Sequence, residues 1–274
     1  MFLASLCLAL GACQGVLIHE VKSDYSHIKV IDYGSRRALF FVGDKELNLV
    51  ETLMDLREPY RLQHPYAHAM AAGLVYRPDP GTVLLVGLGG GALVRFLNHY
   101  FPSVRLDVVE IDPAVVEVAR DYFGTRPGPG TRIIVADGRD FLARSTERYD
   151  LILLDAHLYP SELTDATGHP LSLRTTAFYR SVQARLRPDG VVLFNMIAGR
   201  DGSSYMADVC RAFAAVDVLA VAESTNLIVV AKADGAMPDD AVLRRRARAL
   251  DNDDYGFSFE RQLDIRQPRE RTCN

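Results

Sequence analysis

The stretch from Val83 to Asp112, VLLVGLGGGALVRFLNHYFPSVRLDVVEID, decides the fold of this 274-residue chain. It opens with an apolar run typical of a buried strand, passes through alternating glycines, and then changes to helical spacing. A second strand-like run, Leu106–Val109, leads into Glu110 and Asp112. We therefore predict a strand, a glycine turn, a helix and a second strand with acids at its carboxyl end.

The glycine turn has features of a nucleoside site. Glycine allows a sharp bend and the close approach of a ligand, and the helix that follows presents unpaired N–H groups at its amino end. Glu110 follows Gly87 by about 20 residues, the spacing of an acid that binds ribose hydroxyls. The glycines alone leave open a plain turn between strands, and Ala92 at the sixth position leaves NAD open. Together, the glycines and the acid favour nucleoside binding.

Composition narrows the class of protein. Hydrophobic residues make up 49% of the chain and charged residues 24%, which is typical of a globular protein with a large core. A net charge of −4 gives no reason to expect nucleic acid as a partner. The four cysteines lack the spacing of a zinc site, and we predict neither a metal site nor a disulfide framework. They are Cys7, Cys13, Cys210 and Cys273.

The first 14 residues bear on localisation. MFLASLCLALGAC ends in Leu10–Cys13, which resembles a bacterial lipoprotein signal with Cys13 as the lipidated residue. The segment has no Lys or Arg, although a signal peptide normally begins with a charged region. A wrongly chosen start or the stub of a membrane segment are the alternatives. A true signal predicts a membrane-anchored lipoprotein, whereas a nucleoside cofactor made in the cytoplasm predicts a cytoplasmic protein.

The rest of the chain divides into three parts. Residues 15–58 predict a small antiparallel β-domain, with alternating strand patterns up to Phe41 and an irregular segment from Glu46 to Met54. Residues 59–250 alternate strands and helices, which predicts a doubly wound, Rossmann-like α/β sheet. Residues 251–274 predict a polar, mobile tail.

Acids recur where predicted strands of the large sheet end. Glu110, Asp137 and Asp155 each follow such a strand, and the carboxyl ends of parallel strands share one edge, where ligands bind. We therefore expect the three acids to converge on one site. Tyr66 and His68 lie on a predicted helix before the first parallel strand; contact with substrate and ordinary packing are both open for them.

Five motifs carry a resemblance to a known family. VLLVGLGGG, VVEIDPAVVEVAR, ADGRDFL, YDLILLDA and LRPDGVVLFN resemble the successive motifs of the spermidine synthase (polyamine aminopropyltransferase) family. That family has the class I S-adenosylmethionine methyltransferase fold with an amino-terminal β-domain. The resemblance extends over roughly Leu17 to Lys232.

The resemblance implies roles for particular residues. Asp155 matches the family's catalytic acid, which accepts a proton from an attacking amine. The donor is decarboxylated S-adenosylmethionine, and no metal is implied. The residues implied in binding this co-substrate are Gly87, Gly89, Gly90, Gly91, Glu110, Asp137 and Gly138.

Two departures leave the acceptor and the donor open. Gly90 stands where the family has an Asp that pairs with the aminopropyl ammonium, and Leu158 stands where it has an Asp that holds the amine. Burying an ammonium without a partner is costly. The residues that we consider as substitutes in the following loop are His157, Tyr159, Glu162 and Asp165, and Tyr66 and His68 remain candidates for substrate contact.

Three functions are therefore compared. The first is an aminopropyltransferase with a small-molecule amine as acceptor. The second is a methyltransferase that uses intact S-adenosylmethionine, and the third is a non-catalytic nucleoside-binding relative. Fold analogy does not decide among them. The family habit of pairing through the amino-terminal β-domain implies a homodimer, with membrane contact only through a lipid at Cys13.

Overall fold

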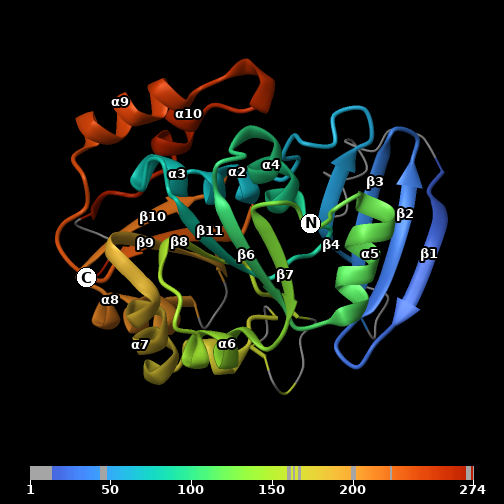
Figure 1. Ribbon diagram of the computed structural model, residues 1–274, viewed down its shortest axis with the longest axis horizontal. Coiled ribbons are helices and arrows are strands. Elements are labelled where there is room, and N and C mark those ends of the chain that lie inside the picture. Colours follow the sequence, from blue (N-terminus) through green and yellow to red (C-terminus); the bar gives the residue numbers. More distant parts are fainter. Residues whose placement is uncertain are drawn as a thin grey trace.

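The computed structural model describes residues 14–43, 48–158, 162, 164–165, 168–198, 202–222, 224–269 and 273. The predicted signal with Cys13 and the candidate Tyr159 lie outside these residues. Two sheets form the framework, with helices on both faces of the larger one (Figure 1). This arrangement confirms the predicted α/β fold with a small antiparallel sheet before a Rossmann-like sheet.

The amino-terminal sheet contains four antiparallel strands in sequential order. They are β1 (Val16–Lys22), β2 (His27–Tyr33), β3 (Arg36–Val42) and β4 (Asn48–Asp55). The prediction that Glu46 to Met54 is irregular is wrong, because most of that segment forms β4. Leu39 pairs with Thr52 while Phe40 pairs with Val50, so Glu51 is an extra residue, a β-bulge that breaks the two-residue alternation.

The larger sheet has seven strands in the order β10-β11-β9-β8-β5-β6-β7. Neighbouring strands pair in parallel from β9 to β7, whereas β11 pairs antiparallel with both β9 and β10. The central strands consist almost entirely of buried apolar residues, as expected for a sheet covered on both faces. The strands are β5 (Thr82–Val86), β6 (Arg105–Glu110), β7 (Thr131–Val135), β8 (Tyr149–Leu154), β9 (Leu186–Ile197), β10 (Ala215–Ala220) and β11 (Asn226–Lys232).

Two apolar cores cover the two faces. One packs against α6 (Gly138–Arg144), α7 (Thr176–Arg185) and α8 (Gly202–Ala212). The other joins the opposite face to the amino-terminal sheet through Ile28 and Leu39, both fully buried. Its helices are α2 (Pro65–Ala71), α3 (Gly73–Tyr76), α4 (Ala92–Tyr100), α5 (Pro113–Phe123), α9 (Asp240–Leu250) and α10 (Phe259–Asp264). Short 3₁₀ turns occupy Leu171–Arg174 and Asp253–Tyr255. The shared core joins the amino-terminal sheet to the larger sheet.

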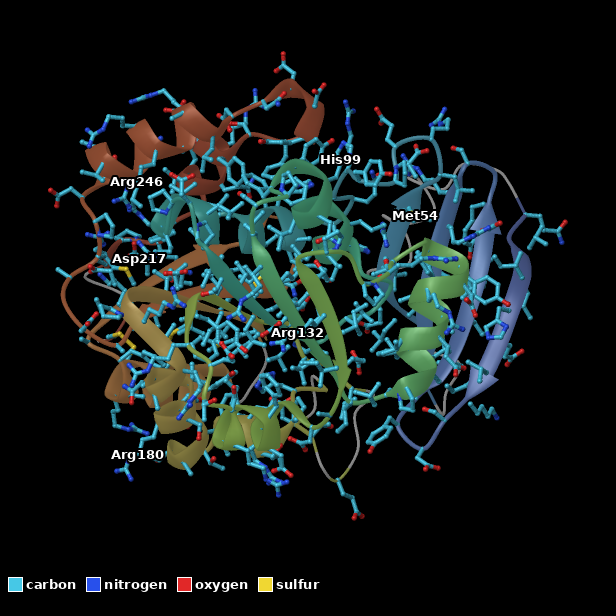
Figure 2. All side chains as sticks on the ribbon, viewed as in Figure 1. Met54, His99, Arg132, Arg180, Asp217 and Arg246 are labelled. Atoms are coloured by element: carbon cyan, nitrogen blue, oxygen red, sulfur yellow. A yellow bond between two sulfur atoms is a disulfide. The ribbon has the colours of Figure 1, made fainter. Side chains whose placement is uncertain are left out.

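The described part of the carboxyl-terminal segment packs on the body, so the prediction of a mobile tail is wrong there. Phe259 and Leu263 of α10 are buried in the core. Asp217, labelled in Figure 2, is fully buried, and its carboxylate accepts hydrogen bonds from Arg269 Nε at 2.7 Å and from the Tyr76 hydroxyl at 3.0 Å. Apolar and charged contacts therefore both hold this segment.

A disulfide joins Cys210 on α8 to Cys273. The prediction of no disulfide framework is therefore wrong. The two residues are 63 positions apart, and only the return of the carboxyl-terminal segment to α8 brings their Cα atoms to 5.6 Å. Among the described residues, no helix is long and apolar enough to cross a membrane.

Candidate active site

A cavity of about 460 Å³ lies at the carboxyl ends of β5, β6 and β8, where the two sheets meet. Its walls include most of the residues that the sequence predicted for the site. Those residues are Gly87, Gly89, Glu110, Asp137, Gly138, Asp155, Tyr66 and His157. The three acids at the strand ends therefore do surround one space.

Gly87 allows two strand ends to approach closely. Its φ is 96°, in the region that favours glycine. A Cβ there would lie 2.1 Å from the carbonyl oxygen of Asp155, so no other residue fits without moving the backbone. This approach brings the turn after β5 against the residue that follows β8.

Gly90 lies behind the cavity wall, and its surroundings explain why no acid stands there. A Cβ on Gly90 would lie 2.8 Å from Cγ2 of Thr52 and 3.1 Å from a ring carbon of Phe123. The Gly90 N–H donates to Oγ1 of Thr52 at 2.8 Å, and its carbonyl accepts from the Thr125 hydroxyl at 2.8 Å. β4 therefore fills the space that a side chain at position 90 would need.

Glu110 is fixed at the end of β6. Its two carboxylate oxygens accept from the N–H groups of Leu88 at 2.8 Å and Asp112 at 2.9 Å. Burial raises the pKa of Glu110 to about 7, although these hydrogen bonds act in the opposite direction. A carboxylate has about four lone-pair sites, so Glu110 keeps acceptor capacity for a ligand hydroxyl beside its backbone donors.

Asp112 ties the amino-terminal sheet to the site. It accepts from the hydroxyls of Ser23 at 2.6 Å and Ser26 at 2.5 Å, and it also caps α5 through the N–H of Ala114. The sequence showed Asp112 only as an acid near a strand end. No pattern in the chain indicated the two serine partners, because they come from the turn between β1 and β2.

Asp137 is the N-cap of α6. One carboxylate oxygen accepts from the N–H groups of Arg139 at 2.7 Å and Asp140 at 3.1 Å. A Cβ on Gly138 would lie 2.5 Å from Cγ1 of Val86, so glycine allows α6 to begin directly against the end of β5. The other oxygen of Asp137 has no hydrogen bond within the described residues, and Asp137 lines the cavity.

Asp155 accepts hydrogen bonds from side chains of two elements, β9 and α2. Its carboxylate accepts from Nδ2 of Asn195 at 2.7 Å and from the Tyr66 hydroxyl. Asn195 is itself oriented by Nδ2 of Asn226, at 2.9 Å from its Oδ1. Burial raises the pKa of Asp155, while its partners favour the ionised form. Because its side chain is 18% exposed, a ligand can reach it.

His157 lies beside this acid, with Nδ1 4.0 Å from the Asp155 carboxylate. Burial lowers the pKa of His157, which favours the neutral imidazole. Burial raises the pKa of Tyr66 well above its ordinary value, which keeps its hydroxyl protonated as a donor to Asp155. Tyr66 therefore donates to Asp155, and a neutral His157 lies beside the same carboxylate.

Three other candidates have different surroundings. His68 does not line the cavity: its ring stacks on Phe257 with centroids 4.5 Å apart, and Nε2 contacts the Leu62 carbonyl at 2.8 Å. Asp165 pairs with Arg174 at 3.2 Å and is likewise outside the cavity wall. Glu162 is exposed at the cavity rim.

Glu51, Thr52 and Asn195 also belong to the site and were not singled out from the sequence. Asn195 carries a signal that could have revealed it, because it ends the apolar run VVLF and so reaches the same sheet edge as the acids. Glu51 and Thr52 lie in the segment that the sequence predicts to be irregular. No group of His, Cys, Asp and Glu in the described part of the chain has a metal-binding arrangement.

The strand order and the covering helices define a protein with the class I methyltransferase fold, with a cavity at the edge of its larger sheet. Residues 64–219 match the spermine/spermidine synthase domain, and the chain belongs to that family. This confirms the family and the transferase class expected from the sequence.

The proteins similar to this chain include an aminopropyltransferase, a methyltransferase-like protein and a spermidine synthase. The polyamine aminopropyltransferase of Vibrio vulnificus is 28% identical over 95% of this chain and 87% of its own. Human methyltransferase-like protein 13, solved with SAH, is 27% identical with a TM-score of 0.64, covering 76% of this chain and 95% of its own. A spermidine synthase solved with the transition-state analogue AdoDATO has a TM-score of 0.68 at 20% identity, covering 91% and 84%, and supports the fold alone.

Proposed function

We propose that this protein transfers an aminopropyl group from decarboxylated S-adenosylmethionine to a small-molecule amine. The observation that carries the proposal is Asp155: an accessible carboxylate with a raised pKa, oriented by Asn195 and Tyr66. A carboxylate with a raised pKa is a better proton acceptor than an ordinary one. The family and its aminopropyltransferase members agree with this chemistry.

The reaction needs one base and good alignment. The nitrogen of a neutral amine attacks the carbon beside the sulfonium, a C–N bond forms, and the C–S bond breaks with its electron pair remaining on sulfur. Methylthioadenosine leaves as a neutral thioether, and the proton lost by the amine passes to Asp155. Sulfonium is a good leaving group, so the remaining contribution is positioning.

The predicted nucleoside contacts fit the cavity. We assign the ribose hydroxyls to Glu110 and the adenine to Asp137 and Gly138, with Gly87 and Gly89 beside the sulfonium end. Glu110 and Asp137 are both held by backbone N–H groups, so they are oriented before a ligand binds. We assign Gly90 and Gly91 to the shape of the turn and not to contact with the donor, because neither residue lines the cavity.

Methyl transfer from intact S-adenosylmethionine is the second candidate. Leu158, which lines the cavity, replaces an acid suited to a diamine, and the human methyltransferase-like relative is of comparable identity. The experiment is to incubate the full chain with either donor and a series of amines and to identify the products by mass. Methylthioadenosine together with an aminopropylated amine supports the proposal. S-adenosylhomocysteine together with a methylated product contradicts it.

Two further expectations remain proposals. Pairing of two copies through the amino-terminal sheet is favoured by its edge strand β1, where Val16 and Leu17 are 60% and 50% exposed; sedimentation would measure it. Lipid attachment at Cys13 would be measured by metabolic labelling with palmitate.

A further inference from the structure

Glu51 has an unusual position in β4. As the extra residue of the β-bulge, it has no partner on β3. A bulge redirects the side chains around it, and here Glu51 and Thr52 both line the cavity although they are adjacent in the strand. Regular alternation would have directed one of them to the opposite face of the sheet.

The carboxylate of Glu51 is unpartnered. No hydrogen bond or ion pair to it occurs within the described residues, and the charged groups that affect it are Asp155 and Glu110, both negative. Burial and these two acids raise the pKa of Glu51 to about 8. With this pKa the carboxyl of Glu51 is largely protonated at neutral pH in the empty cavity, and a positively charged ligand beside it would favour its ionised form.

The surroundings of Gly90 connect this acid to the glycine turn. Thr52 occupies the space of a side chain at position 90 and accepts the Gly90 N–H at 2.8 Å. Thr52, whose side chain leaves no room for an acid at position 90, therefore directly follows Glu51 in β4.

We propose that Glu51 binds the primary ammonium of the donor and makes the cavity select decarboxylated S-adenosylmethionine over the intact form. This inference rests on the proposed function and specifies its donor. The decarboxylated donor brings a sulfonium and an ammonium but no carboxylate. The intact donor would bring its carboxylate close to Glu51, Glu110 and Asp155, where like charges repel.

The test is calorimetric titration of the full chain with three ligands: decarboxylated S-adenosylmethionine, S-adenosylmethionine and neutral methylthioadenosine. We expect the unaltered protein to bind the decarboxylated donor at least about tenfold more tightly than the intact one. Glu51→Gln should reduce the affinity for the decarboxylated donor about tenfold or more. The ratio between the affinities for the two donors should then fall, while the affinity for methylthioadenosine stays within about twofold of the wild-type value. Glu51→Asp should retain part of the preference for the decarboxylated donor, because aspartate retains the carboxylate.

The control is Glu117→Gln on the exposed side of α5, which should leave all three affinities unchanged. An unchanged donor preference in Glu51→Gln would overturn the inference, as would a wild-type preference for the intact donor. Loss of methylthioadenosine binding in both Glu51 variants would show a structural role and overturn it too. The proposed function fails separately, if the unaltered chain transfers no aminopropyl group while Glu51 still discriminates the donors.

Discussion

The backbone N–H of Gly90 donates a hydrogen bond of 2.8 Å to Oγ1 of Thr52. This bond joins the glycine turn of the larger sheet to β4 of the amino-terminal sheet. It makes the small sheet one wall of the cavity, so the two sheets form a single site. The conformation of the glycine turn therefore depends on Thr52, which lies 38 positions before Gly90 in the chain.

Thr52→Val tests this connection. Valine keeps the shape of threonine but cannot accept the Gly90 N–H, and an unsatisfied buried donor costs about 1–3 kcal/mol. We expect the free energy of unfolding to fall by that amount in urea titrations, and methylthioadenosine binding to weaken. Thr52→Ser, which retains the hydroxyl, is the matched control. Equal stability of the valine variant and the wild type would refute the role assigned to this bond.

Glu110→Ala should weaken methylthioadenosine binding about tenfold or more, because the ribose loses its acceptor. Calorimetry measures the affinity, and circular dichroism checks that the variant is folded, since two buried N–H groups lose their partner. Glu117→Ala, an exposed alanine substitution on α5, is the control. Unchanged affinity in Glu110→Ala would remove this residue from the nucleoside site.

Asn195→Leu should move the acid limb of the pH–activity profile upward. The Asn195 amide donates to the ionised form of Asp155 and so lowers the pKa of that group. Without it the pKa, already raised by burial, rises further, and a higher pH is needed to produce the base. A hydrogen bond to a charged group is worth about 1.5–3 kcal/mol, which corresponds to roughly 1–2 pH units. Profiles of kcat/KM measure the shift.

Asn98→Leu on α4, outside the cavity wall, should leave that profile in place. If the acid limb of Asn195→Leu coincides with that of the wild type, Asp155 is not the group whose ionisation limits the reaction.

Cys273→Ser should lower the free energy of unfolding by about 2–4 kcal/mol, because the cross-link to Cys210 restricts the unfolded chain over a long loop. Denaturant titration with and without a thiol reductant measures this. The reductant should destabilise the wild type and have no further effect on Cys273→Ser. Insensitivity of the wild type would mean that the disulfide contributes nothing to stability.

The sequence predicted those parts of the fold that rest on local patterns. Alternating strands and helices around Gly87 and Glu110 gave the larger sheet, and the carboxyl-end rule placed Glu110, Asp137 and Asp155 at one cavity. The sequence does not predict β4, because the bulge at Glu51 breaks the alternation of apolar and polar residues and because Thr52 and Asp55 are buried although they are polar. The disulfide and the packed carboxyl-terminal helix depend on contacts between distant segments, which no local pattern reports.

The surroundings of two predicted site residues, Gly90 and His68, likewise depend on tertiary packing. Gly90 was recognised as a departure from the family, but its cause, the side chain of Thr52, becomes evident only when the two sheets are brought together. His68 lies two residues after Tyr66 on α2, which places it on the other side of the helix, and its ring stacks on Phe257 instead of lining the cavity. Periodicity predicts the faces of elements, whereas the neighbours of each face come from tertiary packing.

The most direct test of the account is the rate of aminopropyl transfer in Asp155→Asn, measured beside its affinity for decarboxylated S-adenosylmethionine. Asparagine keeps the size of the side chain but cannot accept the proton of the attacking amine. We predict that turnover falls about 10²–10⁴-fold, while donor affinity stays within about threefold. Wild-type turnover in this variant would contradict the central claim that Asp155 is the base of the reaction.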